Sequence, residues 1–292
     1  MRKFLIVITL LAMSAATAQS FAAEKRALVL AVFGTSTEAA ITFDELVPLL
    51  KKQFHGRDVF VPYTSPVIRN KLNKDRKAAD KLLSPEEMFN KLKKDGYTDL
   101  FVATTIVFDG VEYEKLKADT DKFAKANKSI KIKLATPLVS SDANISKVVD
   151  TLAPYVRKDA INILVAHGTH SGHSVEKRYL AVQKAFEAKY ANSYMGTVEG
   201  VPSVDSAYEK VKKANDKQVQ FLVFMFVAGD HAENDVAGDE EDSMFSAVKK
   251  LGKIPSIAKI KVKGKDRMLS LGLIPAYQKL LVEHIAYNAT VH

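Results

Sequence analysis

The chain has 292 residues, and 43 Lys and Arg against 34 Asp and Glu give it a formal net charge of +9 at pH 7. It contains no cysteine, which excludes disulfide bonds, Cys-type zinc sites and thiol catalysis. The basic residues are dispersed and no basic stripe interleaves with aromatics, so we expect no nucleic-acid partner. A chain of this length suffices for one large domain or two smaller lobes.

Residues 1–22 have the pattern of a secretory signal peptide. A basic start precedes the apolar run Phe4–Met13, and small residues follow, with cleavage expected between Ala18 and Ala23. The run is short for a membrane span, although an uncleaved anchor is the alternative. We therefore expect an exported, periplasmic protein that is not an integral membrane protein. Cleavage removes two basic residues and no acid, which leaves a net charge of +7.

The rest of the chain alternates strand-like apolar runs with amphipathic, helix-like segments. The clearest helix start is Ser84-Pro85-Glu86-Glu87, with a capping serine, a proline and acids in the first turn. Predicted strands cover 26–33, 58–63, 99–108, 130–135, 160–166, 194–199, 219–227 and 256–262, and predicted helices cover 38–54, 84–94, 112–125, 143–155, 175–190, 203–214, 242–251 and 275–287. Such alternation is typical of parallel sheets with right-handed crossovers.

The two halves of the chain resemble each other. Residues 30–35 match residues 164–169 in character and in their place after a strand. The pattern predicts an α/β fold of two similar lobes, each a parallel β-sheet flanked by helices, with a cleft between them. We assign residues 1–22 to the signal peptide, 23–142 to the N-terminal lobe, and 143–292 to a C-terminal lobe that carries the metal site and the closing helix.

Histidines follow two of the apolar runs in the second half. His167 ends one run, and His231 lies among acids after the other. In open α/β sheets, ligands bind beyond the carboxyl ends of the strands. The first half has Phe33 and Gly110 at the matching places. We therefore expect the chemistry on the second lobe, with the first lobe as the opposing wall of the cleft.

Three motifs carry a family resemblance: VAHGTHSGH (165–173), GTVEG (196–200) and VAGDHAENDVAGDEEDS (227–243). They are similar to the anaerobic (class II) sirohydrochlorin cobaltochelatases, and the similarity covers essentially the whole mature chain. The resemblance implies two four-stranded lobes around a tetrapyrrole and insertion of Co(II), with Fe(II) as a second candidate, into sirohydrochlorin. The metal and catalytic residues of the family map onto His167, Glu199 and His231.

This set of side chains suits metal insertion. Two imidazoles and a carboxylate bind borderline ions such as Co(II), Fe(II), Ni(II) or Zn(II) and leave coordination positions open, so the donor set does not select one physiological metal. An imidazole also accepts a proton near neutral pH, and Glu199 can hold the metal or take a proton. The alternatives are structural roles: a histidine that only makes a hydrogen bond at a strand end, and a glutamate that only caps a turn. The resemblance implies no organic cofactor.

Three further polar residues near these motifs have no assigned role. His170 and His173 extend a metal cluster, or are solvent-facing loop residues, or lie at the cleft rim. Asp235 either attracts cations and protons or belongs to an acidic cluster before the next helix. His284, on the closing helix, is expected to be structural.

Export to the periplasm conflicts with a role in tetrapyrrole synthesis, because that synthesis is expected inside the cell. The alternative function is an exported carrier of tetrapyrrole, haem or metal that retains the chelatase scaffold. Haem-carrying members of the resembled family use an extra histidine after a first-lobe strand, and Thr104–Val107 offers none here. The predicted partners are a sirohydrochlorin-like tetrapyrrole and a divalent metal, and the sequence leaves a homo-oligomer open.

Overall fold

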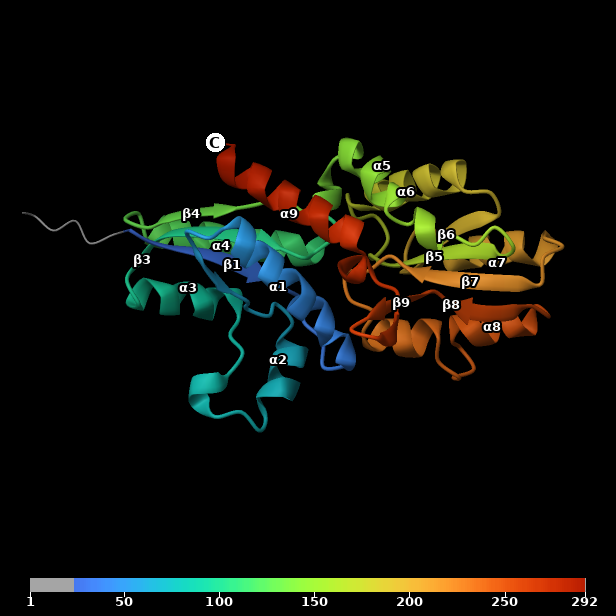
Figure 1. Cartoon of the computed structure of the whole chain (residues 1–292), viewed down its shortest axis with the longest axis horizontal. Coiled ribbons are helices and arrows are strands. Elements are labelled where there is room, and N and C mark those ends of the chain that lie inside the picture. Colours follow the sequence, from blue (N-terminus) through green and yellow to red (C-terminus); the bar gives the residue numbers. More distant parts are fainter. Residues whose placement is uncertain (1–23, 292) are drawn as a thin grey trace, which may run out of the picture.

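The computed structural model describes residues 24–291, so the predicted signal peptide, residues 1–22, lies outside the described part. Two four-stranded sheets, each flanked by helices, lie end to end along the molecule (Figure 1). Every strand pair within these two sheets is parallel. The predicted fold class, two similar lobes built on parallel sheets, is confirmed.

The first sheet has the strand order β2-β1-β3-β4. Its strands are β1 (Lys25–Ala31), β2 (Asp58–Phe60), β3 (Tyr97–Thr104) and β4 (Lys131–Leu134), and its helices are α1 (Ile41–Gln53), α2 (Pro66–Asn73), α3 (Pro85–Lys94) and α4 (Val111–Ala126). The predicted start of α3 is confirmed as a capping box. The backbone N–H of Glu87 donates to Ser84 Oγ at 3.2 Å, and the N–H of Ser84 donates to the Glu87 carboxylate at 2.7 Å.

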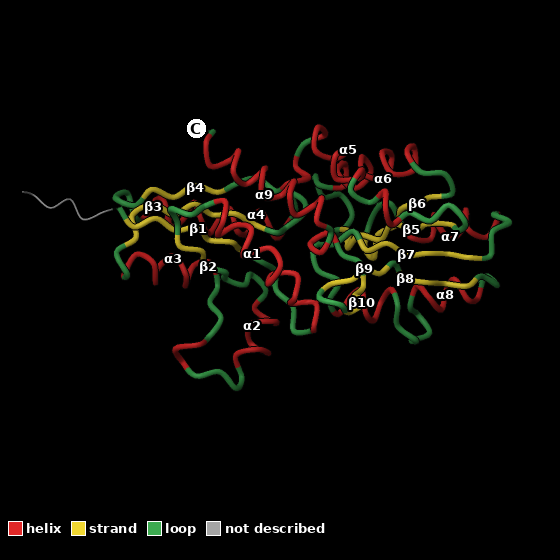
Figure 2. Tube along the Cα trace, viewed as in Figure 1, coloured by secondary structure: helices red, strands yellow, loops and turns green. Residues whose placement is uncertain are grey.

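The second sheet repeats this topology with the order β6-β5-β7-β8. Its strands are β5 (Ile161–Gly168), β6 (Ser193–Glu199), β7 (Gln218–Val223) and β8 (Ile254–Ile257), and its helices are α5 (Asp142–Asp150), α6 (Glu176–Lys189), α7 (Val204–Lys213) and α8 (Met244–Lys250). A π-helix spans Ala232–Val236, and short 3-10 turns cover Glu38–Ala40, Ala78–Asp80, Leu138–Ser140, Ala153–Tyr155 and Leu271–Leu273. The tube in Figure 2 shows how loops connect the two lobes.

Several predicted strands end earlier than expected, and two of them have a long apolar run beyond the observed end. The strand predicted for 219–227 stops at Val223, and the one predicted for 99–108 stops at Thr104. The remaining apolar residues are buried in loops: the N–H of Phe224 still donates to Val165 O, but the carbonyl of Phe226 accepts from Gly272 instead of a sheet neighbour. Burial, not strand pairing, explains these apolar runs, and hydrophobicity alone does not separate the two.

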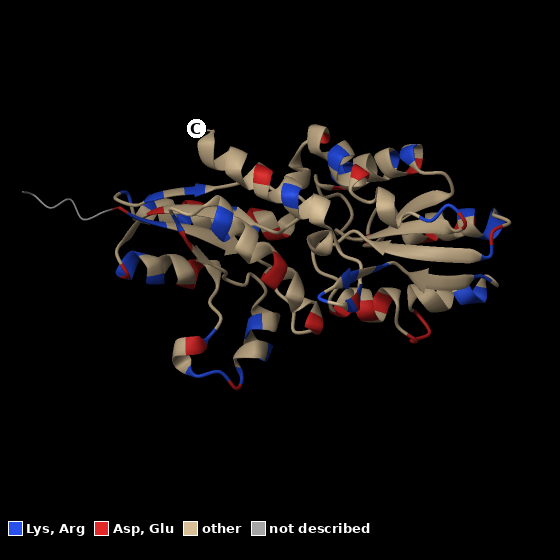
Figure 3. Cartoon of the chain, in the orientation of Figure 1, with Lys and Arg blue, Asp and Glu red and all other residues tan. Residues whose placement is uncertain are grey.

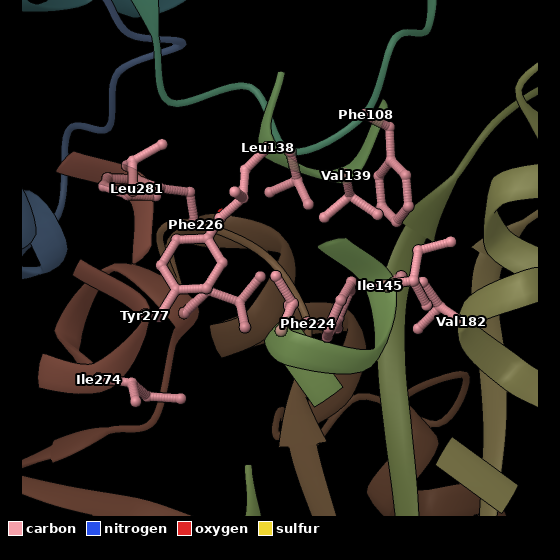
Figure 4. Close-up of a cluster of buried hydrophobic side chains, with 14 of the residues drawn as sticks. Phe108, Leu138, Val139, Ile145, Val182, Phe224, Phe226, Ile274, Tyr277 and Leu281 are labelled. Atoms are coloured by element: carbon pink, nitrogen blue, oxygen red, sulfur yellow. The ribbon is translucent and has the colours of Figure 1, made fainter. Parts of the chain in front are cut away.

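One apolar core joins the lobes. Phe224 and Phe226 are 1% and 6% exposed and belong to the same cluster as buried side chains of both sheets. Phe226 stacks on Phe43 of α1 with ring centroids 6.0 Å apart, and lies 6.3 Å from Tyr277. Figure 4 shows side chains of several elements converging there: Phe108, Leu138, Val139, Ile145, Val182, Phe224, Phe226, Ile274, Tyr277 and Leu281. The core fixes one lobe against the other.

The end of the chain differs from the prediction. The strand predicted for 256–262 is divided between β8 and β9 (Lys259–Val262), and β9 forms an antiparallel hairpin with β10 (Lys265–Met268). Lys263 and Gly264, both with positive φ, make the turn. Helix α9 (Pro275–Thr290) then returns over the first lobe, where it packs on α1 and its His284 Nε2 lies 2.8 Å from the Thr136 carbonyl oxygen. His284 therefore has the structural role expected of it.

Within residues 24–291, each helix is too short or too polar to traverse a bilayer. Lys and Arg lie on both lobes in Figure 3 and are not gathered into one block.

Candidate functional site

The structure brings the two predicted histidines together. His167 is the last residue but one of β5, and the loop after β7 carries His231 to the start of the π-helix. Their ring centroids lie 4.9 Å apart with the ring planes at 82°. The strands point their carboxyl ends toward the middle of the molecule in both lobes (Figure 1), so the histidines lie where the lobes face each other.

Each of these histidines has an acceptor beside Nδ1. His231 Nδ1 lies 2.8 Å from Asp235 Oδ2, and His167 Nδ1 lies 3.4 Å from the carbonyl oxygen of Gly168. The Gly168 carbonyl can only accept a hydrogen bond, so the neutral His167 ring carries its proton on Nδ1. An ionised Asp235 carboxylate also only accepts, and it imposes the same tautomer on His231. Both rings then present the lone pair of Nε2. The His231 side chain is 57% exposed, so an ion can reach it from solvent.

Glu199 ends β6, the strand that pairs with the one carrying His167. β5 and β6 are parallel, with Gly168 opposite Glu199. Since successive side chains alternate between the faces of a strand, Glu199 lies on the α6 face of the sheet and His167 on the α7 face. Among residues 24–291, no group of three or more His, Asp or Glu side chains is arranged to hold a metal ion. The assignment of Glu199 to the metal set therefore stays a prediction.

The turn after β5 requires glycine. Gly168 has φ +89°, and a Cβ there would lie 1.8 Å from the carbonyl oxygen of Glu199. That carbonyl accepts a hydrogen bond from the Thr169 N–H at 3.2 Å. The lack of a side chain at Gly168 therefore allows β5 to approach β6 closely at the residue after His167.

Tyr179 of α6 supports this turn and was missed by the sequence analysis. Its hydroxyl donates to the Gly168 carbonyl at 3.1 Å, and its ring packs on Phe108 of the first lobe with centroids 4.1 Å apart. Burial raises the pKa of Tyr179, and the nearby charge of Glu199 raises it further. The hydroxyl therefore stays protonated and acts as the donor.

His170 and His173, the other two histidines of the motif at 165–173, make their contacts with other residues than His167 and His231. His173 Nδ1 accepts from the Val175 N–H at 3.1 Å, and Nε2 lies 3.4 Å from the carboxylate of Glu114 in the first lobe. Its side chain is only 11% exposed, so of the alternatives for His173 the solvent-facing one does not hold, and a place at the cleft rim stays a prediction. His170 is exposed, and its ring lies 5.2 Å from that of His173. Neither extends the His167–His231 pair.

The first lobe faces the histidines with a different surface. The residue that matches His167 is Phe33, which is 44% exposed. Two residues further on, Thr35 touches the second lobe: its Oγ1 lies 2.9 Å from the position a Cβ would take on Gly229. Gly229 is two residues before His231, so the exposed Phe33 lies on a loop that meets the loop carrying this histidine.

A partly buried ion pair also links the lobes. Arg178 of α6 lies 3.6 Å from the Asp109 carboxylate of the first lobe and donates to Asp142 at 2.8 Å.

Two surface hollows, of about 640 Å³ along α4 and about 480 Å³ between α5 and α9, lie away from the site, and neither is lined by His167 or His231.

The chain is similar in sequence to known proteins over most of its length. A model of the cobalt chelatase family CbiK matches residues 26–290. The sirohydrochlorin cobaltochelatase of Salmonella typhimurium is 26% identical over 268 residues, which cover 89% of this chain and 95% of the relative. The sirohydrochlorin cobaltochelatase CbiKC of Nitratidesulfovibrio vulgaris is 24% identical over 236 residues, which cover 78% of this chain and 81% of the relative.

Solved structures resemble the fold. SirB from Bacillus subtilis with Fe3+ superposes with a TM-score of 0.60 at 11% identity, covering 91% of this chain and 96% of SirB. The sirohydrochlorin chelatase SirB from Bacillus subtilis subspecies spizizenii, in complex with cobalt, gives 0.59 at 10% identity, covering 91% and 95%. At such identities the likeness extends to the fold alone, and it is the same two-lobed architecture.

Proposed function

The chain belongs to the CbiK family of cobalt chelatases, and on this premise we propose that it is an enzyme that inserts Co(II) into sirohydrochlorin. The observation that carries the proposal is the His167–His231 pair, 4.9 Å apart at the carboxyl ends of two neighbouring strands. Among residues 24–291, no side chain or backbone group makes a hydrogen bond to Nε2 of either ring. Two such nitrogens can hold a divalent ion while leaving the positions that the ring nitrogens of a macrocycle need.

The reaction removes two N–H protons from the macrocycle as the metal enters. His167 and His231 are the proposed ligands that take the ion from water and hand it over. Glu199 is the proposed third participant, either as a metal ligand or as the group that accepts a proton. Glu199 is the last residue of β6, the strand next to the one that carries His167.

The macrocycle is proposed to lie between the lobes, against the histidines and Phe33. A flat aromatic ligand can pack on an exposed phenyl ring, and Phe33 is 44% exposed next to the loop that touches Gly229. The positive net charge of the chain complements a polycarboxylate substrate.

Co(II) is the proposed physiological metal and Fe(II) the second candidate, and the proposal requires no organic cofactor. SirB structures hold Fe3+ or cobalt. Imidazole and carboxylate donors do not choose between such ions by affinity alone, so availability in the compartment decides. We propose further that residues 1–22 direct export to the periplasm. That address favours the second candidate function, an exported carrier that binds a tetrapyrrole or metal without metallating it.

The test is an anaerobic metallation assay. The mature chain is incubated with sirohydrochlorin and Co(II), and the absorbance change of the ring is followed. We expect wild type to accelerate metallation and His231→Ala to lose activity by about 100-fold or more, since it lacks one of two ligands. Glu233→Gln, on the same π-helix, is the matched control and should keep full activity. Tight binding of the ring by wild type without metallation would establish the carrier instead.

A further inference from the structure

Asp235 has a contact that sets it apart from the acids around it. Its Oδ2 lies 2.8 Å from His231 Nδ1, and this is the only hydrogen bond or ion pair that the described residues make with its side chain. Neighbouring acids differ. Glu241 pairs with Lys250 of α8, and the exposed side chain of Glu233 makes no such bond within residues 24–291. Asp235 is therefore directed at one of the two proposed metal ligands.

The π-helix supplies this geometry. It spans Ala232–Val236, and His231 is the residue before it. Residues four apart on a helix face the same side, which brings the Asp235 carboxylate under the His231 ring. The Ala237 N–H donates to the Ala232 carbonyl, and a hydrogen bond between residues five apart is the pattern of a π-helix. Single-turn π segments are rare and recur at functional sites.

The two histidines are not held equally. His231 Nδ1 has a charged acceptor at 2.8 Å, whereas His167 Nδ1 has a carbonyl at 3.4 Å that Tyr179 also uses. Hydrogen bonds to an ionised acceptor are the stronger ones, so the His231 ring is fixed in orientation and tautomer while the His167 ring is held loosely.

We propose that Asp235 is the positioning residue of the metal site: it holds the Nδ1 proton of His231 and thereby presents Nε2 to the incoming ion. The inference rests on the proposed function. Partners of this kind, in which a carboxylate orients a metal-binding imidazole, change metal affinity by 10- to 100-fold when removed. In this role Asp235 acts through its contact with Nδ1 of His231.

Co(II) binding to the mature chain, without tetrapyrrole, tests the inference. Affinity is measured from the visible absorption of Co(II) for wild type, His231→Ala, Asp235→Ala, Asp235→Asn and Glu233→Gln. We expect Asp235→Ala to weaken binding by about 10- to 100-fold. Asp235→Asn keeps an amide oxygen that can accept from Nδ1 and should recover most of the affinity. Glu233→Gln removes one nearby negative charge and should leave binding unchanged.

A second readout separates positioning from a structural role. Long-range ¹H–¹⁵N NMR of the metal-free chain at a pH where the imidazole is neutral should show His231 protonated on Nδ1 in wild type and Asp235→Asn. In Asp235→Ala that preference should be lost while the signals of the rest of the chain persist.

The outcomes distinguish this inference from the proposed function. Loss of binding in His231→Ala together with wild-type binding and an unchanged tautomer in Asp235→Ala overturns the inference alone. Equal weakening by Glu233→Gln overturns it as well, because the effect would then be general electrostatic attraction. Wild-type affinity in His231→Ala overturns the metal site itself, and with it both proposals.

Discussion

The two lobes share a topology and differ at both ends of their sheets. Arg26 and Asp99 face each other near the amino ends of β1 and β3, and Asn162 and Gln220 face each other near the amino ends of β5 and β7. The first pair is ionic, with Arg26 Nε donating to Asp99 at 3.0 Å, and the second is a neutral amide pair at 3.2 Å. The same backbone thus tolerates two kinds of polar pairing at the amino ends of its strands.

The carboxyl ends show the difference that matters for function. Phe33-Gly34 in the first lobe and His167-Gly168 in the second precede the same kind of turn, in which the glycines have φ +98° and +89°. The turn is common to both lobes, and only the residue before it changes from phenyl to imidazole. The comparison teaches that the repeated fold supplies the same turn in both lobes, and that the side chain before the turn sets which of the two offers a metal-binding nitrogen.

The strongest test of this comparison concerns the core that the lobes share. Phe226→Ala removes a ring packed on Phe43 and Tyr277, so we expect the free energy of unfolding to fall by about 3–5 kcal/mol. Because the core is continuous, tyrosine fluorescence and circular dichroism should report one coincident transition in urea. Tyr287→Ala, an aromatic truncation at a residue 66% exposed, is the control and should change stability by less than about 0.5 kcal/mol. Two separate transitions in wild type would mean that the lobes are independent units.

The two turn glycines should respond differently to alanine. In Gly168→Ala the new Cβ meets the backbone carbonyl of Glu199 at 1.8 Å, whereas in Gly34→Ala it meets the Tyr63 ring at 2.3 Å, and a side chain can move aside. We expect a loss of about 3 kcal/mol for Gly168→Ala and about 1–2 kcal/mol for Gly34→Ala, each measured by urea denaturation. Equal losses would show that the close contact of β5 with β6 is not a special feature of the second lobe.

The smallest effect concerns the ionic pair of the first lobe and its dependence on pH. Partial burial tends to raise the pKa of Asp99, but hydrogen bonds and charges of Arg57 and Arg26 outweigh it and hold the pKa below its ordinary value of 3.8. The carboxylate therefore stabilises the fold above about pH 4, and this contribution disappears as the pH falls through the depressed pKa.

Replacing Asp99 by Asn removes that contribution. At pH 7 the variant should be less stable by about 1 kcal/mol, since solvent screens the partly exposed cluster. The difference between the two proteins should shrink as acid protonates the wild-type carboxylate. Gln220→Glu in the second lobe is the reciprocal experiment: it places a carboxylate against Asn162 without an arginine and should destabilise the protein. A pH-independent difference for Asp99→Asn would contradict the ionic account.

Much of this architecture could be predicted from local patterns. Alternating apolar runs and caps located the strands and helices, and His167 and His231 could be found because one ends such a run and the other closely follows one. The face on which Glu199 lies could not be found, because it depends on the register of β6 against β5. The strand limits were wrong where Phe224 and Phe226 serve the core between the lobes, and the π-helix that brings Asp235 to His231 leaves no simple periodicity.

The most direct test of the central claim is to locate the ion. Crystals of the mature chain soaked with Co(II), measured at the cobalt absorption edge, should show one anomalous peak about 2.1 Å from Nε2 of both His167 and His231. Density linking the ion to Glu199 would add the third ligand. A peak at the first lobe's strand ends, near Phe33, or a peak bound by only one of the histidines would contradict the account.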